Sequence, residues 1–340
     1  MKMSQQTELN TIEKGGRIDH FLLVRKCEIR LTKAGKEYLY LEVGDKTQTI
    51  NANLWDNFNN ISGSLASGDV VKISGSMDDF QGSPQIKVTS IRKAKPSDNI
   101  SPKDFLPKSK RNPDEMKNEF FTRMERLTDP FLKSLMKQIF NEKNFEKFST
   151  SPAGKSWHHS YIHGLLEHTL EIIRICDLMC DIHTEINRDL LICGTMMHDF
   201  GKTEELSSDN TFDYTDKGKL LGHIVISAMI VNEETKKING FPEDLKNCLL
   251  HLILSHQGKL EYASPVVPKT LEAIALYQAD ELSAKVNAYK NALASGTLSE
   301  NKWTKFISLA ATDLYNHGIN PETDNSILPS GQAGSKTLFN

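Results

Sequence analysis

A change in hydrophobic periodicity partway along the chain is the strongest constraint on its fold. Between residues 18 and 95, apolar and polar side chains alternate, most clearly from Glu37 to Val43. Such alternation is typical of strands that bury one face. From about residue 115 to residue 312, apolar positions recur at helical spacing instead. The sequence therefore predicts a multidomain protein, with an N-terminal small β-barrel followed by an all-α helical bundle.

The alternating region predicts about five short strands, which suit an OB-fold barrel. Strands are expected at Glu37–Val43, Thr47–Leu54, Val70–Met77 and Gln85–Lys93. Leu39, Leu41 and Val43 would line the barrel core, whereas Tyr38 and Tyr40 would face outward. Exposed aromatic side chains on such barrels stack on single-stranded bases, so Tyr38 and Tyr40 are candidate nucleic-acid-binding residues. The alternative is that these tyrosines are merely exposed. Trp55 is expected in the core, whereas Phe58 could lie in the core or stack on a base.

Composition places the domain boundaries. Residues 1–17 form an N-terminal extension and residues 18–95 the barrel. Residues 96–114 read as a linker, because the stretch from 94 to 115 contains four prolines and scattered polar residues. We predict that this stretch contributes nothing to a core. Residues 115–315 form the helical domain, and residues 316–340 a flexible polar tail.

Net charge and cysteine content limit the partners and the cellular compartment that the sequence allows. The 340 residues carry a formal net charge of −3, so any basic surface must be local. The five cysteines are an odd number without close paired spacings, which favours a reducing cytoplasm over a disulfide framework. The chain has no long apolar run, so we expect neither secretion nor membrane insertion.

Most of the 11 histidines lie between His158 and His256, and one forms an adjacent His198-Asp199 pair that ends an apolar helix. A carboxylate beside an apolar run needs compensation, and a cation is the usual one. Imidazole and carboxylate ligands suit Zn, Mn, Fe or Co. The alternative is a capping Asp beside a core His. Gly201 follows the pair and is expected to end the helix as a C-cap.

Two further residues could join the His198-Asp199 pair at one ion. His168 lies on the preceding amphipathic helix and Asp280 on a later one. This order resembles the HD-domain superfamily of metal-dependent phosphohydrolases, whose fold is a helical bundle. The resemblance implies that His168, His198, Asp199 and Asp280 are ligands of a first metal. It also implies His223 and His256 as second-metal ligands, although Gln257 stands where many relatives carry a second histidine.

Other residues near the pair are candidates for substrate contact. Lys202 follows Asp199 by one helical turn, where its ammonium would hold a scissile phosphate. A lysine that complements a helix dipole is the alternative. The pair His158 and His159 lies in a polar loop before the His168 helix, where it would contact nucleic acid or face solvent.

The whole chain resembles the YhaM-type 3′→5′ exoribonucleases. The resemblance rests on Ala52–Asp56 in the barrel, and on Gly164–Thr169, Met197–Lys202 and Gly258–Thr270 in the helical domain. It implies a cytoplasmic hydrolase that trims single-stranded RNA, and in some members single-stranded DNA. A homo-oligomer is implied by the resemblance alone.

We therefore expect a metal-dependent 3′→5′ exonuclease that releases nucleoside 5′-monophosphates through a metal-activated water, with Asp199 and Lys202 as catalytic residues. One or two divalent ions are expected, with Mn²⁺ favoured over Fe, Co or Ni. Two alternatives remain open. One is an HD phosphohydrolase that acts on free nucleotides and has a regulatory barrel. The other is a non-catalytic RNA-binding protein whose HD site has decayed.

Overall fold

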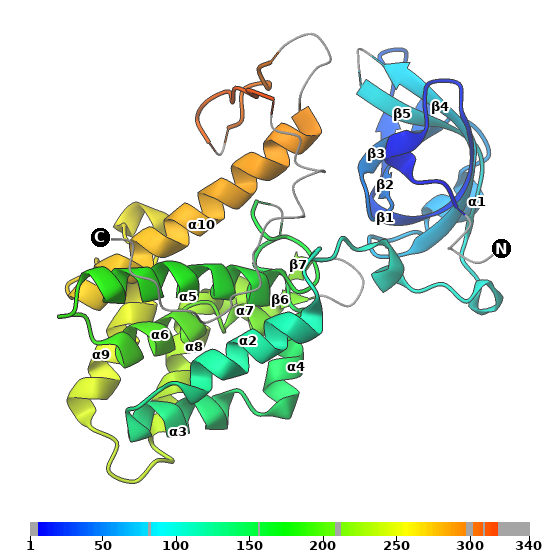
Figure 1. Ribbon diagram of the computed structural model, residues 1–340. Helices are drawn as coiled ribbons and strands as arrows, with labels where there is room; N and C mark the ends of the chain where they lie inside the picture. The colour runs from blue at the N-terminus through cyan, green and yellow to red at the C-terminus, as the bar shows by residue number, and fades with distance from the viewer. Residues whose placement is uncertain are drawn as a thin grey trace. The chain divides into compact units, whose positions relative to one another are not determined.

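The computed structural model describes residues 6–80, 83–155, 157–207, 212–296, 302–308 and 310–318. The chain divides into a first unit, Met1–Glu281, and a second unit, Leu282–Asn340. The first unit contains the strands of the barrel and the helices that carry the histidines (Figure 1). Among the described residues, no helix combines the length and the apolar character needed to cross a bilayer.

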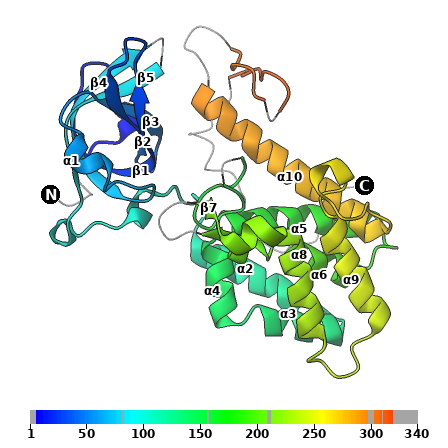
Figure 2. The same cartoon turned by 180° about the vertical axis from the view of Figure 1, so that it is seen from behind.

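The N-terminal strands form a closed barrel, as predicted. Its strands are β1 (Arg17–Leu31), β2 (Glu37–Gly44), β3 (Thr49–Leu54), β4 (Val70–Phe80) and β5 (Ser83–Lys93). They join in the order β1-β2-β3-β5-β4, and β4 closes the barrel by pairing with β1. All pairs are antiparallel except β3 with β5. Figures 1 and 2 show this closure from two sides.

The barrel core follows the predicted alternation. Leu39, Leu41 and Val43 on β2 are fully buried, and Phe58 beside the short helix α1 (Asn59–Ser62) is buried too. The prediction that Trp55 lies in the core is wrong. Trp55 is only half-buried and stacks on Tyr38, with ring centroids 4.6 Å apart. The alternation of β3 ends at Leu54, so the residue after it is free to leave the core side.

Residues 96–114, predicted to be a linker, bury more apolar side chains than expected. They form two short 3₁₀ turns, Pro96–Asp98 and Pro102–Phe105, and then enter α2. Phe105 and Leu106 are buried in a cluster with Phe21, Leu23 and Val70 of the barrel strands. The prediction that this stretch contributes nothing to a core is therefore wrong, because two apolar residues among the prolines find partners distant in sequence.

The helices of the first unit surround one core. They are α2 (Pro113–Glu125), α3 (Pro130–Ile139), α4 (Glu142–Thr150), α5 (Gly164–Ile182), α6 (Arg188–Met197), α7 (Lys202–Glu205), α8 (Asp216–Thr235), α9 (Glu243–Ser255) and α10 (Leu271–Gly296), whose first residues up to Glu281 belong to this unit. Helix α6 contacts both α5 and α9, and α8 contacts α7 and α9. A short hairpin of β6 (Leu206–Ser207) and β7 (Asp213–Tyr214) follows α7.

Helices are present within each stretch that the sequence predicts to be helical, 115–139 with an interruption at Asp129-Pro130, 162–180, 188–200, 220–237, 242–255 and 268–292. Helix α4 was not expected from the sequence. Asp129-Pro130 separates α2 from α3, and the Asp129 carboxylate accepts the Leu132 amide as an N-cap. Helix α8 begins before the predicted position and is interrupted by Gly222, whose φ of 71° is outside the helical region.

The second unit contributes little regular structure to the described part of the chain. Helix α10 continues to Gly296, and isolated bridges pair Trp303 with Tyr315 and Ile307 with Thr312. Of the predicted flexible tail, residues 319–340 lie outside the described residues.

Candidate metal centre

The HD pair lies at the end of the most buried helix. Every residue of α6 from Asp189 to Met197 is buried, so the chain leaves this helix inside the core and not at the surface. Phe200 then packs against Phe140 and Phe148, with ring centroids 5.2 and 6.0 Å away. Held on both sides, His198 and Asp199 have exposed fractions of 0% and 2%.

Gly201 fixes the next turn for a different reason from the one predicted. The sequence predicts a C-cap, but Gly201 has a right-handed backbone, with φ −60° and ψ −19°. A Cβ atom at this position would lie 2.2 Å from the carbonyl oxygen of His223. Glycine is therefore required so that the HD turn can approach α8 closely, and this approach brings His223 to Asp199.

Four separate elements deliver their ligand-type side chains to Asp199. His168 comes from α5, His223 from the break in α8, His256 from the end of α9 and Asp280 from α10. His168 and His256 are fully buried and Asp280 is 9% exposed. The ligand atoms form two groups, each within 4.8 Å: His168, His198 and Asp280, and Asp199, His223 and His256.

Asp199 joins the two groups. Its Oδ2 atom lies 3.3 Å from Nε2 of His198 and 3.8 Å from Nε2 of His168. Its Oδ1 atom lies 3.3 Å from Nε2 of His223 and 3.6 Å from Nε2 of His256. The carboxylate thus turns one oxygen toward each group of histidines, so Asp199 would be a ligand in both groups if each held a cation.

The histidines are held with Nε2 directed inward. The Nδ1 atoms of His198 and His256 each lie 2.7 Å from a backbone carbonyl, those of Thr195 and Ile253. The Nδ1 atom of His223 lies 3.1 Å from the Glu205 carboxylate. Because each acceptor requires a proton on Nδ1, the lone pair is left on Nε2, which is the usual arrangement of metal-ligating histidines.

The chemistry of this donor set fits a divalent cation. Nε2 of His198, Nε2 of His223 and Oδ1 of Asp199 are buried and have no hydrogen-bond partner among the described residues. Buried polar atoms without partners are rare, and each costs free energy unless something satisfies it. Burial lowers the pKa of His256 to about 4, which keeps its imidazole neutral and able to ligate. Mixed nitrogen and oxygen donors suit Mn, Fe, Co, Ni or Zn.

Lys202 supplies a buried positive charge beside the carboxylate. Its Nζ atom donates to Oδ2 of Asp199 at 2.6 Å, and its side chain is only 9% exposed. Burial would raise the pKa of Asp199, but the Lys202 ammonium and His198 outweigh it and hold this pKa well below its ordinary value. Lys202 therefore faces the ligand cluster rather than solvent.

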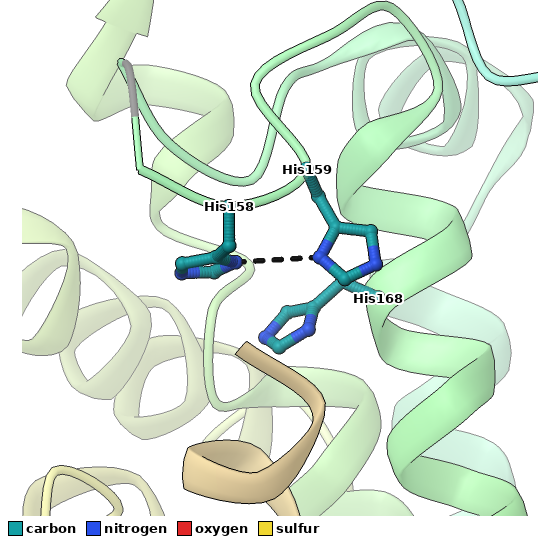
Figure 3. A group of neighbouring side chains, drawn as sticks. All are labelled: His158, His159 and His168. Atoms are coloured by element: carbon teal, nitrogen blue, oxygen red, sulfur yellow. Dashed lines mark hydrogen bonds between the residues drawn. The ribbon is translucent and has the colours of Figure 1, made fainter. Parts of the chain in front are cut away.

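The loop histidines lie beside the same cluster. His159 is fully buried, so the solvent-facing alternative is wrong for it, and His158 is half-buried. Their ring centroids lie 5.0 and 4.8 Å from that of His168 (Figure 3). By contrast, Nε2 of His251 accepts the Lys269 amide and takes no part in the two ligand groups.

The two predicted barrel residues lie on β2. Tyr38 stacks on Trp55, and the Arg30 guanidinium lies 3.4 Å from the centre of the Tyr40 ring. Trp55 and Arg30, which contact these tyrosines, were not predicted from the sequence, because their outward orientation depends on how the barrel strands pair with one another. Sequence reasoning also missed Glu205, whose only local signal is its place one turn after Lys202.

Comparisons with known proteins agree with this architecture. Residues 165–285 match the HD domain family, and residues 23–94 match the OB-fold nucleic acid binding domain family. The chain is 34% identical over 281 residues to the 3′-5′ exoribonuclease YhaM of Oceanobacillus iheyensis, which covers 82% of this chain and 87% of that protein. It is 31% identical over 283 residues to the YhaM of Bacillus subtilis, covering 83% of this chain and 89% of that protein. The chain therefore belongs to the YhaM family of 3′-5′ exoribonucleases.

Proposed function

We propose that the protein is a metal-dependent 3′→5′ exoribonuclease that degrades single-stranded RNA to nucleoside 5′-monophosphates in the cytoplasm. The observation that carries the proposal is the Asp199 carboxylate, which lies between two groups of ligand-type side chains and beside the Lys202 ammonium. Similarity to proteins named 3′-5′ exoribonuclease supports RNA as the substrate class and the direction of cleavage.

In this proposal, His168, His198, Asp199 and Asp280 hold a first divalent ion, and His223 and His256 complete a second position with Asp199. When bound, such ions supply Lewis acidity that activates water and neutralises charge on a phosphodiester. We propose Mn²⁺ for the site, one of the ions that mixed imidazole and carboxylate donors suit.

Of two further side chains, Lys202 would act on the substrate directly and Glu205 would act indirectly. The Lys202 ammonium is held by Asp199 at 2.6 Å, so its remaining protons can reach a phosphate oxygen. There it would stabilise the negative charge that grows on the phosphate during cleavage. Glu205 acts through His223, since its carboxylate fixes the imidazole orientation.

The outer face of β2 and β3 supports RNA binding by the barrel. The Tyr38–Trp55 stack presents aromatic surface, and the Arg30 guanidinium, which also pairs with Glu28, lies over the Tyr40 ring. Stacking on such surfaces is tolerant of sequence, because every base has a π face. Single-stranded DNA offers the same bases, so we propose it as a second, weaker substrate.

The test is incubation of the purified protein and Mn²⁺ with single-stranded RNA labelled at its 5′ end. Products that shorten progressively from the 3′ end, and that disappear with a chelator, are the expected result. Asp199→Ala should abolish this cleavage while RNA binding persists. Intact RNA despite binding would refute the nuclease assignment. Hydrolysis of free nucleotides without RNA cleavage would instead favour the phosphohydrolase alternative.

A further inference from the structure

The loop between α9 and α10 begins with a tight turn, residues 258–264, that has two left-handed backbone positions. Gly258 has a φ of 76° and Ala263 a φ of 64°, and the 3₁₀ turn Leu260–Tyr262 lies between them. A Cβ atom at Gly258 would lie 2.2 Å from the ring of Tyr277 on α10. Glycine is required here for both reasons, because it tolerates the positive φ and leaves room for the ring. The 258–264 turn is thus fitted closely against α10.

Hydrogen bonds fix the shape of the 258–264 turn. The Lys259 carbonyl accepts the amides of Tyr262 and Ser264, at 3.0 and 3.2 Å. The Ser264 side chain is buried, and its hydroxyl oxygen lies 3.1 Å from the Leu254 carbonyl oxygen of α9 and 2.8 Å from that of Val266. The turn is therefore tied to α9 as well as to α10, and its side chains project from a well-defined backbone.

The turn presents apolar and positive groups to solvent. Leu260 is 64% exposed and Tyr262 is 51% exposed. The Nζ atom of Lys259 lies 5.3 Å from the centre of the Tyr262 ring, within the range of a cation–π contact. Large apolar side chains held in water do not stabilise the chain itself, and neighbouring ones are typical of binding surfaces. An aromatic face beside an ammonium is the combination that binds single-stranded nucleic acid, by stacking on bases and by contact with phosphates.

The turn lies close to the metal centre along the chain and across the fold. Lys259 follows the ligand-type residue His256 by three positions, so their Cα atoms are at most about 11 Å apart. Tyr277, against which the turn is fitted, lies one helical turn before Asp280 on α10. The two helices that fix the turn, α9 and α10, thus also deliver two of the side chains of the metal centre.

We propose that the Tyr262 ring stacks on a base next to the scissile phosphate, while the Lys259 ammonium contacts a phosphate of the RNA backbone. The proposal rests on the exoribonuclease function proposed above and gives the helical domain RNA contacts of its own. One aromatic ring accommodates one base, and such stacking accepts any base, as the removal of successive nucleotides requires. A protein partner is a poorer match, because a lysine lies over the exposed ring and lysine is depleted in protein interfaces.

The first test removes one base at a time from the RNA. Three 5′-labelled RNAs are compared: an unmodified strand, one with an abasic last nucleotide and one with an abasic penultimate nucleotide. The kcat/KM for removal of the last nucleotide is measured with Mn²⁺. One of the two abasic strands should react about 5- to 150-fold more slowly than the unmodified strand, the range expected for one lost stack. The position of the effect shows which base stacks.

Variants connect this effect to the turn. Tyr262→Ala should slow cleavage of the unmodified RNA by the same factor and lose the discrimination against the abasic strand, whereas Tyr262→Phe keeps the ring and should keep the discrimination. Lys259→Ala should slow all three RNAs by a similar factor, because it removes a phosphate contact and not a base contact. The matched control is Leu178→Ala. Leu178 is 57% exposed on α5, about 15 Å along the helix from His168, and its variant should behave as the wild type.

The second test does not depend on cleavage. 2-Aminopurine, a base whose fluorescence falls when it stacks, is placed at the last or the penultimate position of an RNA. Binding is measured in excess chelator, so that the RNA stays intact. At saturation, emission from one of the two positions should be lower with the wild type than with Tyr262→Ala, and Leu178→Ala should match the wild type.

The outcomes separate this inference from the proposed function. Equal rates of the wild type on all three RNAs, discrimination that persists in Tyr262→Ala, or equal emission with the wild type and Tyr262→Ala would each overturn the inference. A changed oligomeric state of Tyr262→Ala in size-exclusion chromatography, with the RNA signals unaltered, would also overturn it, in favour of an interface between copies of the chain. If the wild type leaves every RNA intact with Mn²⁺ present, the proposed function fails, whereas the 2-aminopurine emission still decides whether the turn stacks on a base.

Discussion

Removing the charge of Asp199 should destabilise the metal-free protein as well as abolish its activity. In Asp199→Asn, the Lys202 ammonium loses the carboxylate oxygen that it contacts at 2.6 Å. Its side chain is only 9% exposed, so water cannot replace that partner without local opening. Breaking a buried ion pair by removing one partner costs about 3–5 kcal/mol. At about 2–4 °C per kcal/mol for a domain of this size, the melting temperature should fall by roughly 6–20 °C.

A double variant separates the two effects. Asp199→Asn combined with Lys202→Met removes both charges and fills the position of the lysine with an apolar side chain of similar length. Replacing a buried ion pair in this way is often neutral for stability, so most of the lost melting temperature should return. RNA cleavage should stay absent, because the variant lacks both the proposed metal ligand Asp199 and the proposed phosphate-binding ammonium of Lys202.

The assay is thermal unfolding in excess chelator, followed by circular dichroism of the helices, with RNA cleavage in Mn²⁺ measured in parallel. The control is Glu233→Gln, which breaks an exposed pair with Lys236 whose side chains are 62% and 58% exposed and should leave the melting temperature close to that of the wild type. A wild-type melting temperature in Asp199→Asn would refute the reasoning, as would a double variant that is no more stable than the single one.

Four further predictions follow from the same geometry. Mn²⁺ at about 100 times its dissociation constant should stabilise the wild type by about 2.7 kcal/mol in thermal unfolding, and a chelator should reverse this gain. Trp55→Ala should weaken RNA binding by about 1–3 kcal/mol in fluorescence anisotropy, since one stacking surface is lost, while Trp303→Ala should not. Gly201→Ala should lower the unfolding free energy by about 1–3 kcal/mol because its Cβ would meet the His223 backbone, whereas Gly63→Ala meets nothing within 4 Å and should be tolerated. Burial would raise the pKa of Glu119, but Arg174 and Arg111 lower it overall, so its contribution to stability is present at neutral pH and is lost as pH falls. Glu119→Gln should therefore be less stable than wild type at pH 7, and denaturant unfolding should show the difference shrinking below about pH 4.5.

Patterns that repeat along the chain were read correctly from the sequence. Leu39, Leu41 and Val43 are all buried, because side chains on a strand alternate between faces regardless of what packs there. The same holds for the helical period that predicted α5, α6 and α9. Helix α4 was missed because it is short and mostly polar, with Phe145 and Phe148 as its only buried residues.

Contacts between segments that are distant in sequence could not be predicted from periodic patterns. Trp55 was expected in the core, yet it lies against Tyr38 of the neighbouring strand. Phe105 and Leu106 lie among prolines and polar residues, yet they are buried against barrel strands. In each case the burial of the side chain is set by a partner far away in sequence, about which local composition carries no information.

By itself, the sequence determined the kinds of element, the order of the two domains and the donor types of the HD ligands, since periodicity and residue chemistry are properties of the chain. Tertiary structure alone decided which ligands meet at Asp199, because the close approach at Gly201 and the break at Gly222 bring His223 to it. It also decided that His158 and His159 belong beside His168, because the left-handed backbone of His159 and the bare Gly164 hold the loop there. Distances between elements depend on the packing of the whole core, and no local pattern encodes them.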